Sequence, residues 1–445
     1  MLCALCTAPA KALDATRQAS QLIHREWGRA DGLPAEMVWS VHQTSDGYLW
    51  LGTEAGLARF DGAEFEVYSS ATHDAFVVDD VRHIDEAQDG TLWIATFGGG
   101  VLALKGGRFE RFDRDAGLAV DNVYAVKAAS NGDVWAGTTQ GVCRLRSGAF
   151  TCWTGEDGAL NGRVMRLAED AAGTIWLGGL SDGLASFDGE RFTRYPPDDT
   201  LKSTQIFMLH ADAEFNMLVG DYSGRYYRAG AAGIERVTLE NLPENLAPMA
   251  ALRDADGNLL VGMNAGGGLW RLQPDVHRLD SEGLPVSFVF DLAEDRDGGV
   301  WVATTTGLHH LRAGPIVPWG QEEGVANGTF VVSADADGGV WAGAEAEGLF
   351  HVDRDGRVER WTMDDGLPAA SVSALWRDDD GTFWAGTYGG GIALLRDGAI
   401  VDVWGTAQGL PGLQVTVIYR DSRGALWIAT GAGFSRWVDG VHQQT

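Results

Sequence analysis

A phrase that reads Asp-Gly-x-Leu-Trp-x-Gly-Thr recurs ten times along this chain of 445 residues, and its first copy runs from Asp46 to Thr53. The central residue of each copy, here called the anchor, is Trp50, Trp93, Trp135, Trp176, Leu218, Leu260, Trp301, Trp341, Trp384 or Trp427. Successive anchors are 40 to 43 residues apart. A fixed period in the low forties is typical of four-stranded propeller blades. The sequence therefore predicts an all-β propeller of ten blades.

The first repeat shows how one blade is expected to form. Strands are predicted over residues 38–43, 48–53, 57–60 and 65–68, and Asp46-Gly47 and Asp61-Gly62 form the hairpin turns between them. Asp-Gly between β-rich runs favours tight hairpins because both turn positions need positive φ. The anchor is expected to fill the core between neighbouring blades. The residue nine positions before the anchor is apolar in every repeat and is also predicted to be core: Val41, Ile84, Val126, Leu167, Leu209, Ala251, Leu292, Val332, Leu375 and Ile418.

The number of rings is left open by the repeat count. Ten blades exceed the usual number of roughly four to eight, so the chain forms either one large ring or seven blades plus three of a truncated second ring. An aromatic residue 18 to 20 positions after the anchor marks the outer strand: Tyr68, Phe112, Trp153, Tyr195, Trp319, Trp361 and Trp404. Residues 22–27 resemble such a strand without the rest of its blade. We favour a ring in which this N-terminal strand completes the last blade, because closure removes exposed edges.

Charge and the N-terminus bear on partners and compartment. Acidic residues outnumber basic ones by 62 to 34, which disfavours binding to nucleic acid or anionic membranes. No apolar run of about 18 residues is present, so no membrane span is predicted. Residues 1–12 resemble a signal-peptide remnant that ends in Ala10-Lys11-Ala12, although a disordered alanine-rich leader is the alternative. We predict a periplasmic or secreted protein with a leader and closing strand over 13–36 and propeller repeats over 37–445.

Two cysteines flank a short turn symmetrically. Cys143 and Cys152 are equally distant from Ser147-Gly148, which places them opposite each other in a two-residue hairpin. Opposed Cα atoms at a non-hydrogen-bonded pair lie about 4.5 Å apart, within the range of a disulfide. A cross-strand disulfide is therefore predicted, and two buried free thiols are the alternative in a reducing compartment.

No catalytic or metal-binding motif is present in the sequence. The ten histidines are scattered, and the triple-glycine segments fall at the same blade turn each time, which makes them structural. Acidic turns such as Asp254 to Gly257 resemble calcium loops but lack the distal glutamate, and hairpin geometry explains them without a metal. No metal and no cofactor are expected.

Two positions of the repeat vary in size and polarity, in contrast to the core positions. One lies eleven residues before the anchor, at the start of the innermost strand, and the other lies four residues after it, in the loop between the second and third strands. Both belong to the same face of a propeller, so a small-molecule or sugar site is expected there. The alternative is that the aromatic residues only plug the channel. The candidate ligand-binding residues are Trp39, Arg82, Tyr124, Phe207, Phe290, Phe330, Glu54, Phe97, Tyr222, Asn264, Glu345 and Tyr388.

The Gly-Leu-Pro segments, the Asp-Gly-Tyr-Leu-Trp-Leu-Gly-Thr phrase and the segment Gly56 to Gly62 together resemble the two-component regulator propeller repeat. The resemblance covers about residues 24–440 and implies the periplasmic sensor region of a bacterial signalling protein, commonly two seven-bladed propellers. A β-sandwich, a membrane helix and a histidine kinase or diguanylate cyclase usually follow in that family. This chain has ten repeats and no such motif, so it resembles an isolated sensor portion, a truncated reading frame or a free-standing binding protein.

Three functions are compatible with these observations. The first is a non-catalytic sensor that binds a small molecule or oligosaccharide and acts on a signalling output module or a homodimer partner. The second is a propeller lyase or glycan hydrolase, for which Glu54, Glu345, Asp291, His83 and Arg82 are the candidate groups. The third is a protein-interaction scaffold, which requires a large exposed apolar patch. We favour the sensor.

Overall fold

The structure is a computed structural model that describes residues 13, 17, 19–196, 200–239, 242, 246–273, 276–279, 288–314, 317–321, 323–335, 337–438 and 441–443. The chain divides into two compact units, Met1–Val317 and Pro318–Thr445, and each is built from antiparallel four-stranded sheets. The helices among the described residues are single 3-10 turns: η1 (Ala19–Gln21), η2 (Arg29–Asp31), η3 (Arg114–Ala116), η4 (Gly155–Asp157), η5 (Met363–Asp365) and η6 (Thr406–Gln408). In this part of the chain, no helix has the length and apolar character needed to cross a membrane.

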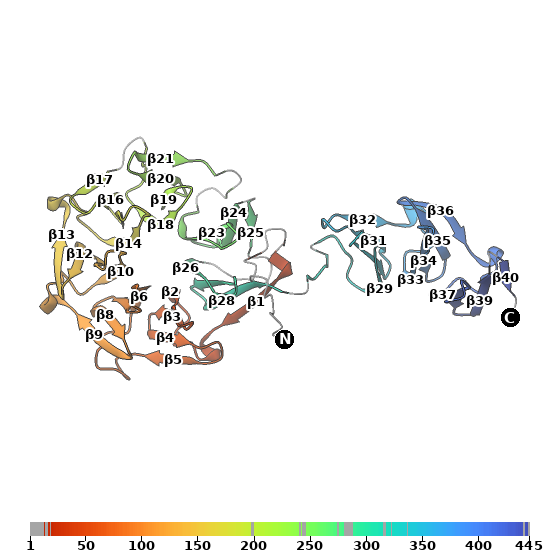
Figure 1. The fold of residues 1–445 in the computed structure, drawn as a ribbon, viewed down its shortest axis with the longest axis horizontal. Helices are drawn as coiled ribbons and strands as arrows, with labels where there is room; N and C mark the ends of the chain where they lie inside the picture. Colours follow the sequence, from red (N-terminus) through yellow and green to blue (C-terminus); the bar gives the residue numbers. More distant parts are fainter. Residues whose placement is uncertain are drawn as a thin grey trace, which may run out of the picture. The chain divides into compact units, whose positions relative to one another are not determined.

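Seven sheets, numbered here as blades 1 to 7, form the first unit (Figure 1). Blade 1 contains β2 (Val38–Gln43), β3 (Leu49–Thr53), β4 (Gly56–Phe60) and β5 (Phe65–Tyr68). Blade 2 contains β6 (Val81–Glu86), β7 (Leu92–Thr96), β8 (Gly100–Lys105) and β9 (Arg108–Phe112). Blade 3 contains β10 (Val123–Ala128), β11 (Val134–Thr138), β12 (Gly141–Arg146) and β13 (Ala149–Trp153). Blade 4 contains β14 (Val164–Glu169), β15 (Ile175–Gly179), β16 (Leu184–Phe187) and β17 (Phe192–Tyr195).

The remaining blades of this unit follow the same order until the last one. Blade 5 contains β18 (Ile206–Asp212), β19 (Asn216–Asp221), β20 (Tyr226–Gly230) and β21 (Gly233–Val237). Blade 6 contains β22 (Pro248–Arg253), β23 (Leu259–Met263), β24 (Leu269–Gln273) and β25 (His277–Arg278). Blade 7 contains β26 (Val289–Glu294), β27 (Val300–Thr304), β28 (Leu308–Ala313) and, as its outer strand, β1 (Leu22–Trp27).

Three further sheets, blades 8 to 10, form the second unit. Blade 8 contains β29 (Thr329–Ala334), β30 (Val340–Ala344), β31 (Gly348–Val352) and β32 (Val358–Trp361). Blade 9 contains β33 (Val372–Arg377), β34 (Phe383–Thr387), β35 (Gly391–Arg396) and β36 (Ala399–Trp404). Blade 10 contains β37 (Val415–Arg420), β38 (Leu426–Thr430), β39 (Gly433–Val438) and β40 (Val441–Gln443).

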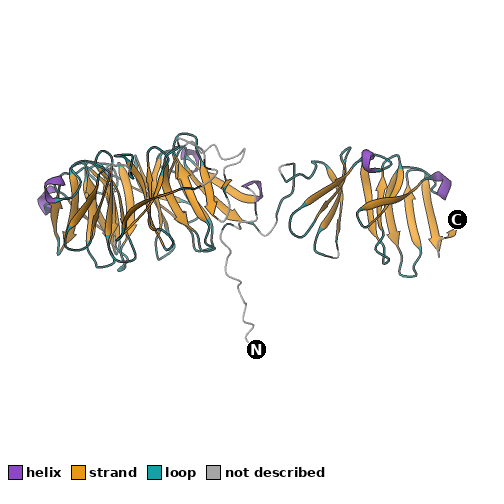
Figure 2. Ribbon diagram, turned by 90° about the horizontal axis from the view of Figure 1, so that it is seen from above, coloured by secondary structure: helices purple, strands orange, loops and turns teal. Residues whose placement is uncertain are grey.

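The first strand of each blade lies nearest the centre of the seven-bladed ring, and strands such as β5, β9, β13 and β17 lie at its circumference (Figure 1). Seen from the edge, the ring is a disc whose strands run across its thickness (Figure 2). The prediction of an all-β propeller with ten four-stranded blades is thus confirmed, in the arrangement of seven blades plus three.

The preferred closure between the two ends of the chain is wrong. β1 pairs antiparallel with β28 over Leu22 to Trp27, while blade 10 has its own outer strand, β40. Trp27 therefore occupies the outer-strand aromatic position of blade 7, where the sequence suggested Trp319, which lies outside any strand. The reason is packing: Trp27 lies 5.4 Å from Phe60 of blade 1 and 5.3 Å from Trp301 of blade 7, between ring centroids.

The core positions named by the repeat are buried or partly buried, with one informative exception. Eight anchors are less than 10% exposed, and the residue nine positions earlier packs against the preceding blade, as Val126 does against Ala95 and Val101. Val332 is the exception because it is 66% exposed. It belongs to blade 8, the first blade of the second unit, where no earlier blade of that unit covers its sheet face.

Blade 3 carries a disulfide between adjacent strands. Cys143 and Cys152 are directly paired in the β12–β13 ladder, and their Cα atoms are 4.0 Å apart. The connecting turn has φ values of 53° at Ser147 and 84° at Gly148, the double positive φ of a type I′ hairpin. The local turn thus places the two sulfurs together, in the way that the sequence symmetry predicts.

Candidate ligand site at the mouth of the seven-bladed ring

The first strand of every blade contains a β-bulge at one fixed position. In blade 1 the register shifts between Val38 and Ser40, which leaves Trp39 without a partner in the ladder. The unpaired residues are Trp39, Arg82, Tyr124, Met165, Phe207, Met249, Phe290, Phe330, Ser373 and Thr416. These are the variable residues eleven positions before the anchor. A bulge redirects a side chain out of the regular ladder, which frees this position from the packing that fixes its neighbours.

A backbone hydrogen bond brings the second variable position to the same place. The amide of Phe97, four residues after its anchor, donates to the carbonyl of Asp80 at 2.8 Å, immediately before the inner strand of its blade. The equivalent bond forms in nine blades, from Phe97, Thr139, Leu180, Tyr222, Asn264, Thr305, Glu345, Tyr388 and Gly431. The loop between the second and third strands therefore lies beside the bulge. This bond holds the two loops on the same face of the blade, as the sequence predicts.

Side chains from four consecutive blades form a continuous group at this face, here called the mouth cluster: Phe288, Phe290, Trp39, Arg82, Phe97 and Tyr124. The Phe290 ring lies 4.8 Å from that of Phe288 and 4.5 Å from that of Trp39, between centroids. The Arg82 guanidinium lies 4.1 Å from the Trp39 centroid and 5.2 Å from the Phe97 centroid. Phe97 in turn lies 5.2 Å from Tyr124. The cluster joins blades 7, 1, 2 and 3 through aromatic and cation–π contacts.

The cluster also holds polar atoms that the fold does not satisfy. The Arg82 guanidinium forms an ion pair with Asp80 at 2.5 Å. Trp39 Nε1, Arg82 Nε and the second carboxylate oxygen of Asp80 have no hydrogen-bond partner among the described residues. Buried polar atoms normally find partners, so three unsatisfied ones in one cluster indicate a place that is not optimised for stability alone.

Charged residues follow the bulge one position further into the channel. His83, Arg166 and Asp291 come from blades 2, 4 and 7 and directly succeed the bulged residues of those blades. Burial lowers the pKa of His83, while the carboxylates of Asp291 and Asp85 act to raise it. Burial also lowers the pKa of Arg166, against the attraction of Asp291. Because Asp291 acts electrostatically on both His83 and Arg166, the three groups lie near one another.

Asp291 itself is held firmly by blade 1. Its carboxylate accepts hydrogen bonds from Ser40 Oγ at 2.9 Å and from the Val41 amide at 3.0 Å. Arg166 donates from Nε to the carbonyl of Phe207 in blade 5 at 2.8 Å. The floor beneath the mouth cluster is therefore a fixed set of opposite charges in a partly dry environment, where electrostatic interactions with a ligand are strengthened.

Not all candidate residues join this site. Phe207 and Tyr222 form a separate pair in blade 5, with ring centroids 5.5 Å apart. Asn264 is buried, and its side-chain oxygen accepts from the Ala247 amide at 2.9 Å, which is a structural role. The exposed Glu54 has no hydrogen bond or ion pair among the described residues. Phe330, Glu345 and Tyr388 belong to the second unit and are therefore not part of the mouth of the seven-bladed ring.

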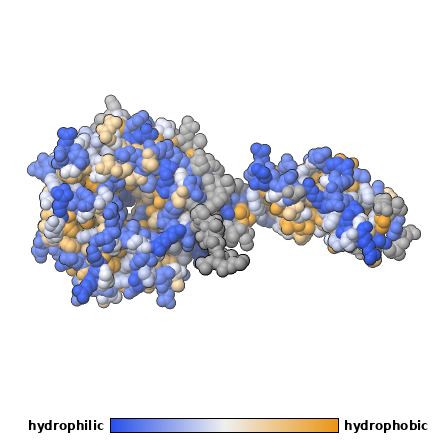
Figure 3. Space-filling model, in the orientation of Figure 1, coloured by the Kyte–Doolittle hydropathy of each residue, from blue (hydrophilic) through white to orange (hydrophobic). Residues whose placement is uncertain are grey.

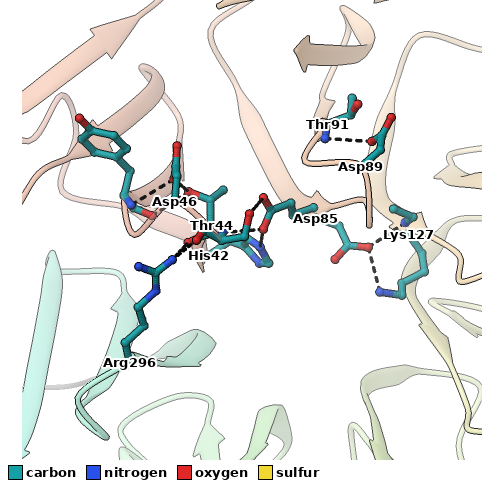
Figure 4. Close-up of polar contacts among 12 residues, drawn as sticks. His42, Thr44, Asp46, Asp85, Asp89, Thr91, Lys127 and Arg296 are labelled. Atoms are coloured by element: carbon teal, nitrogen blue, oxygen red, sulfur yellow. Dashed lines mark hydrogen bonds and ion pairs between the residues drawn. The ribbon is translucent and has the colours of Figure 1, made fainter. Parts of the chain in front are cut away.

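The opposite ends of the inner strands are fixed by polar contacts between adjacent blades (Figure 4). Asp85 of blade 2 accepts hydrogen bonds from Lys127 Nζ at 2.9 Å and from the Ala128 amide at 2.7 Å in blade 3. Arg296 of blade 7 donates to the carbonyl of Ser45 in the first hairpin of blade 1. Charge-assisted bonds of this kind hold the blades in register. The hairpin end of the ring is thus a structural seam.

The ring is hollowed at its centre, as the space-filling view shows (Figure 3). Grooves also lie between blades, and one with a volume of about 650 Å³ lies between blades 4 and 5, beside Asp170 and Arg228. A second groove of about 490 Å³ lies between blades 7 and 1, beside Arg296 and His310. These grooves involve the first hairpins and the outer strands. They do not include the variable positions, so repeat comparison gives no reason to assign them a ligand.

The acidic turns are explained by their own hydrogen bonds. One carboxylate oxygen of Asp254 accepts from the amides of Asp256 at 3.1 Å and Asn258 at 2.8 Å. Asp295 accepts in the same way from the amides of Asp297 and Gly299 at 2.8 Å. Asp side chains stabilise turns through such bonds, so hairpin geometry accounts for the acidic residues of these segments.

Repeat comparison missed Arg166 and Phe288. Arg166 belongs to the position ten residues before the anchor, where Ser40, His83, Ala125, Arg166, Met208, Ala250 and Asp291 are as varied as the neighbouring bulge position. That variation was a usable signal. Phe288 precedes the inner strand of blade 7, and only its 4.8 Å contact with Phe290 reveals its place.

Comparisons with known proteins agree with this architecture. Residues 32–55, 283–306 and 409–432 match the sequence profile of the two-component regulator propeller. The extracellular domain of a hybrid two-component system from B. thetaiotaomicron has 17% identity and a TM-score of 0.61, covering 95% of this chain and 72% of that one. The extracellular domain of a one-component system from the same organism has 16% identity and a TM-score of 0.54, covering 96% and 67%.

An enzyme is also among the similar structures. A virginiamycin B lyase from Staphylococcus aureus, solved with quinupristin, has 11% identity and a TM-score of 0.53, and covers 65% of this chain and 99% of that one. At identities this low, the likeness shows a shared fold and does not bear on activity. No curated protein matches the sequence significantly.

Proposed function

We propose that the seven-bladed unit is a non-catalytic, periplasmic sensor that binds a small molecule or oligosaccharide at the mouth cluster. The match to the two-component regulator propeller supports a sensor role. The observation that carries this proposal is the recurring bulge. It frees one residue per blade from the ladder, and in four consecutive blades the freed residues and their neighbours join into one aromatic and cationic surface. Pyranose rings and other flat ligands with apolar faces stack on such aromatic side chains, while Arg82 and the charged floor suit hydroxyl or carboxylate groups.

Signalling would follow from the way the site crosses blade boundaries. A ligand that touches both Phe290 and Tyr124 contacts blade 7 and blade 3 at once. It then favours one arrangement of these blades over another, and a signalling output module or a second copy of the chain would respond to that difference. The ligand can shift the equilibrium between the two blade arrangements by no more than the difference between its binding free energies for them.

The test is a thermal-shift screen of the whole protein against oligosaccharides and small metabolites, followed by calorimetry on any ligand found. Binding raises the melting temperature in a concentration-dependent manner. Trp39→Ala, Phe97→Ala and Tyr124→Ala are each expected to abolish the shift. Phe330→Ala is the matched control, because Phe330 occupies the same bulge in the second unit. A ligand whose effect survives the first three changes and is lost with Phe330→Ala would overturn the proposal.

A second candidate function is suggested by the second unit. Phe330, Val332 and Val340 of blade 8 are 59%, 66% and 41% exposed, and Val417, Tyr419 and Phe434 of blade 10 are 51%, 52% and 58% exposed. Exposed apolar surface of this kind is typical of an interaction site. We propose a second copy of the chain as the partner. Light scattering would then report a dimer that Val332→Glu converts to a monomer, and a monomeric parent protein would contradict this function.

The enzyme alternative finds little support in the geometry. His83 and Asp291 lie near one another, but no hydrogen bond or ion pair among the described residues joins Glu54 to Arg82 or His83, and Glu345 belongs to the second unit. Hydrolysis or elimination needs a paired acid and base on the reacting group. Turnover of a bound oligosaccharide by the purified protein would restore this alternative.

A further inference from the structure

Two histidines and a glutamate meet where the N-terminal strand closes the ring. His24 and Glu26 lie on β1, and His309 lies on β28, 285 positions after His24 in the sequence. His24 Nε2 and His309 Nδ1 are 3.0 Å apart, and the two imidazole rings are stacked. One ligand atom from each of the three side chains lies within 4.8 Å of the other two. The pairing of β1 with β28 creates this group, which is why it is not recognisable from the sequence alone.

All three residues depart from the repeat. His309 lies on the third strand of its blade, paired with the residue that follows the anchor. The residues at this position in the ten blades are Ala58, Leu102, Cys143, Ala185, Tyr227, Trp270, His309, Phe350, Ala393 and Ser435. His309 is the only histidine of this set. The fold therefore does not require an imidazole at this position.

The outer-strand residues are equally unusual. The partners at the Glu26 position are Val67, Arg111, Cys152, Arg194, Arg236, Arg278, Arg360 and Val403, and none of these is acidic. The residues at the His24 position are Phe65, Phe109, Phe150, Phe192, Ile234, Val358 and Ile400, all apolar. Three coordinating side chains replace three non-coordinating ones in the same blade. None of the three replacements is required by the blade fold.

His309 is also poorly satisfied by the fold. Its side chain is 1% exposed, and its Nε2 atom has no hydrogen-bond partner among the described residues. His24 Nε2 and His309 Nδ1 are close enough to share one proton in a hydrogen bond. A cation bound between these two nitrogens accepts one lone pair from each, and His309 then carries its proton on Nε2.

We propose that His24, His309 and Glu26 bind one divalent transition-metal ion, of the Zn²⁺ class, across the closing seam of the seven-bladed ring. Two histidines and one carboxylate are a known zinc ligand set, with a water molecule as the fourth ligand. Two nitrogens at tetrahedral Zn–N distances lie about 3.3 Å apart, close to the 3.0 Å separation of the imidazole nitrogens. The exposed Glu26 has room to approach the ion. Hard cations such as Ca²⁺ prefer all-oxygen sites and are disfavoured here.

The location gives the ion a structural consequence. The Glu26–His309 pair occupies the same ladder position as the Cys143–Cys152 disulfide of blade 3, between the third and the outer strand. In blade 3 these strands are joined by a two-residue turn. In blade 7 the outer strand comes from the other end of the unit, so an ion here holds the whole ring closed. Ion binding is therefore coupled to the stability of closure.

The test is a titration of the chelator-treated full-length protein with Co²⁺, whose visible absorption reports four-coordinate binding, and with Zn²⁺ by equilibrium dialysis and metal analysis. One ion per chain is expected, together with a rise in the melting temperature of the ring. His24→Phe, Glu26→Arg and His309→Leu each restore a residue that other blades use at that position, so these variants are expected to fold. The two histidine replacements should lower the affinity at least tenfold and Glu26→Arg by a similar factor.

The controls separate a specific site from general histidine binding. His73→Gln and Glu66→Gln remove a histidine and a carboxylate elsewhere in blade 1 and its exit loop, and the affinity should not change. Circular dichroism checks that each variant is folded. Failure of the parent protein to bind one ion, or unchanged binding in folded His309→Leu, would overturn the proposal and leave the two histidines as a hydrogen-bonded structural pair.

Discussion

Replacing Trp27 by alanine should open the seven-bladed ring at one defined place. Trp27 pairs with Leu308 at the end of the β1–β28 ladder, and its ring lies between Phe60 of blade 1 and Trp301 of blade 7 at centroid distances of 5.4 and 5.3 Å. The side chain therefore connects the closing strand to two blades at once. Its loss weakens the attachment of β1 and removes packing between the first and the last blade of the ring.

The size of the effect follows from the burial of the ring. Truncation of a fully buried tryptophan to alanine costs about 3 to 5 kcal/mol. Trp27 is only half-buried, so we expect about 2 to 3 kcal/mol, part of it from the two aromatic contacts at about 0.5 to 1.5 kcal/mol each. A local opening free energy lowered by this amount raises the amide exchange rate by a factor of about 30 to 160.

Hydrogen exchange measured by mass spectrometry is the appropriate assay, because unfolding of two units need not follow a two-state transition. Peptides from residues 22–27 and 308–313 should lose protection together in Trp27→Ala, and the peptide from residues 433–443 should keep it. Trp319→Ala is the control, since Trp319 is 39% exposed and should change stability by less than about 0.5 kcal/mol. Loss of protection in 433–443 with 308–313 unaffected would refute closure through blade 7.

Three further predictions follow from the fold. Cys143→Ser should destabilise blade 3 by roughly 2 to 3 kcal/mol, which is the stabilisation expected from a disulfide that closes a short loop. Denaturant titrations of this variant should be unchanged by reducing agent, whereas those of the parent protein should shift. Gly100→Ala should cost more than about 2 kcal/mol, since its Cβ would lie 2.3 Å from a carbonyl oxygen of β9, whereas Gly62→Ala, with open space and a similar positive φ, should cost only about 1 kcal/mol. Burial lowers the pKa of His210, so the unfolded chain binds more protons below about pH 6.5, and stability should fall on acidification through that value, less steeply in His210→Gln.

Features that depend on neighbouring residues in sequence were predictable. The hairpin that joins Cys143 to Cys152 is set by two turn residues with positive φ, and the buried anchors such as Trp135 follow from a pattern that every blade repeats. The two variable positions were recognisable from their place in the repeat, and a backbone bond such as that from Phe97 to Asp80 brings them together in nine blades.

Other features were decided by contacts between distant residues. Residues 22–27 end in the aromatic residue that marks an outer strand, so the sequence indicated an outer strand but not which blade it completes. Packing of Trp27 against Phe60 and Trp301 selected blade 7. The same selection left Val332 exposed and brought His24 beside His309. Local turn chemistry and periodicity act within about forty residues and are written into each repeat. Ring closure is a competition among equivalent edges, and only the three-dimensional packing of side chains far apart in the chain resolves it.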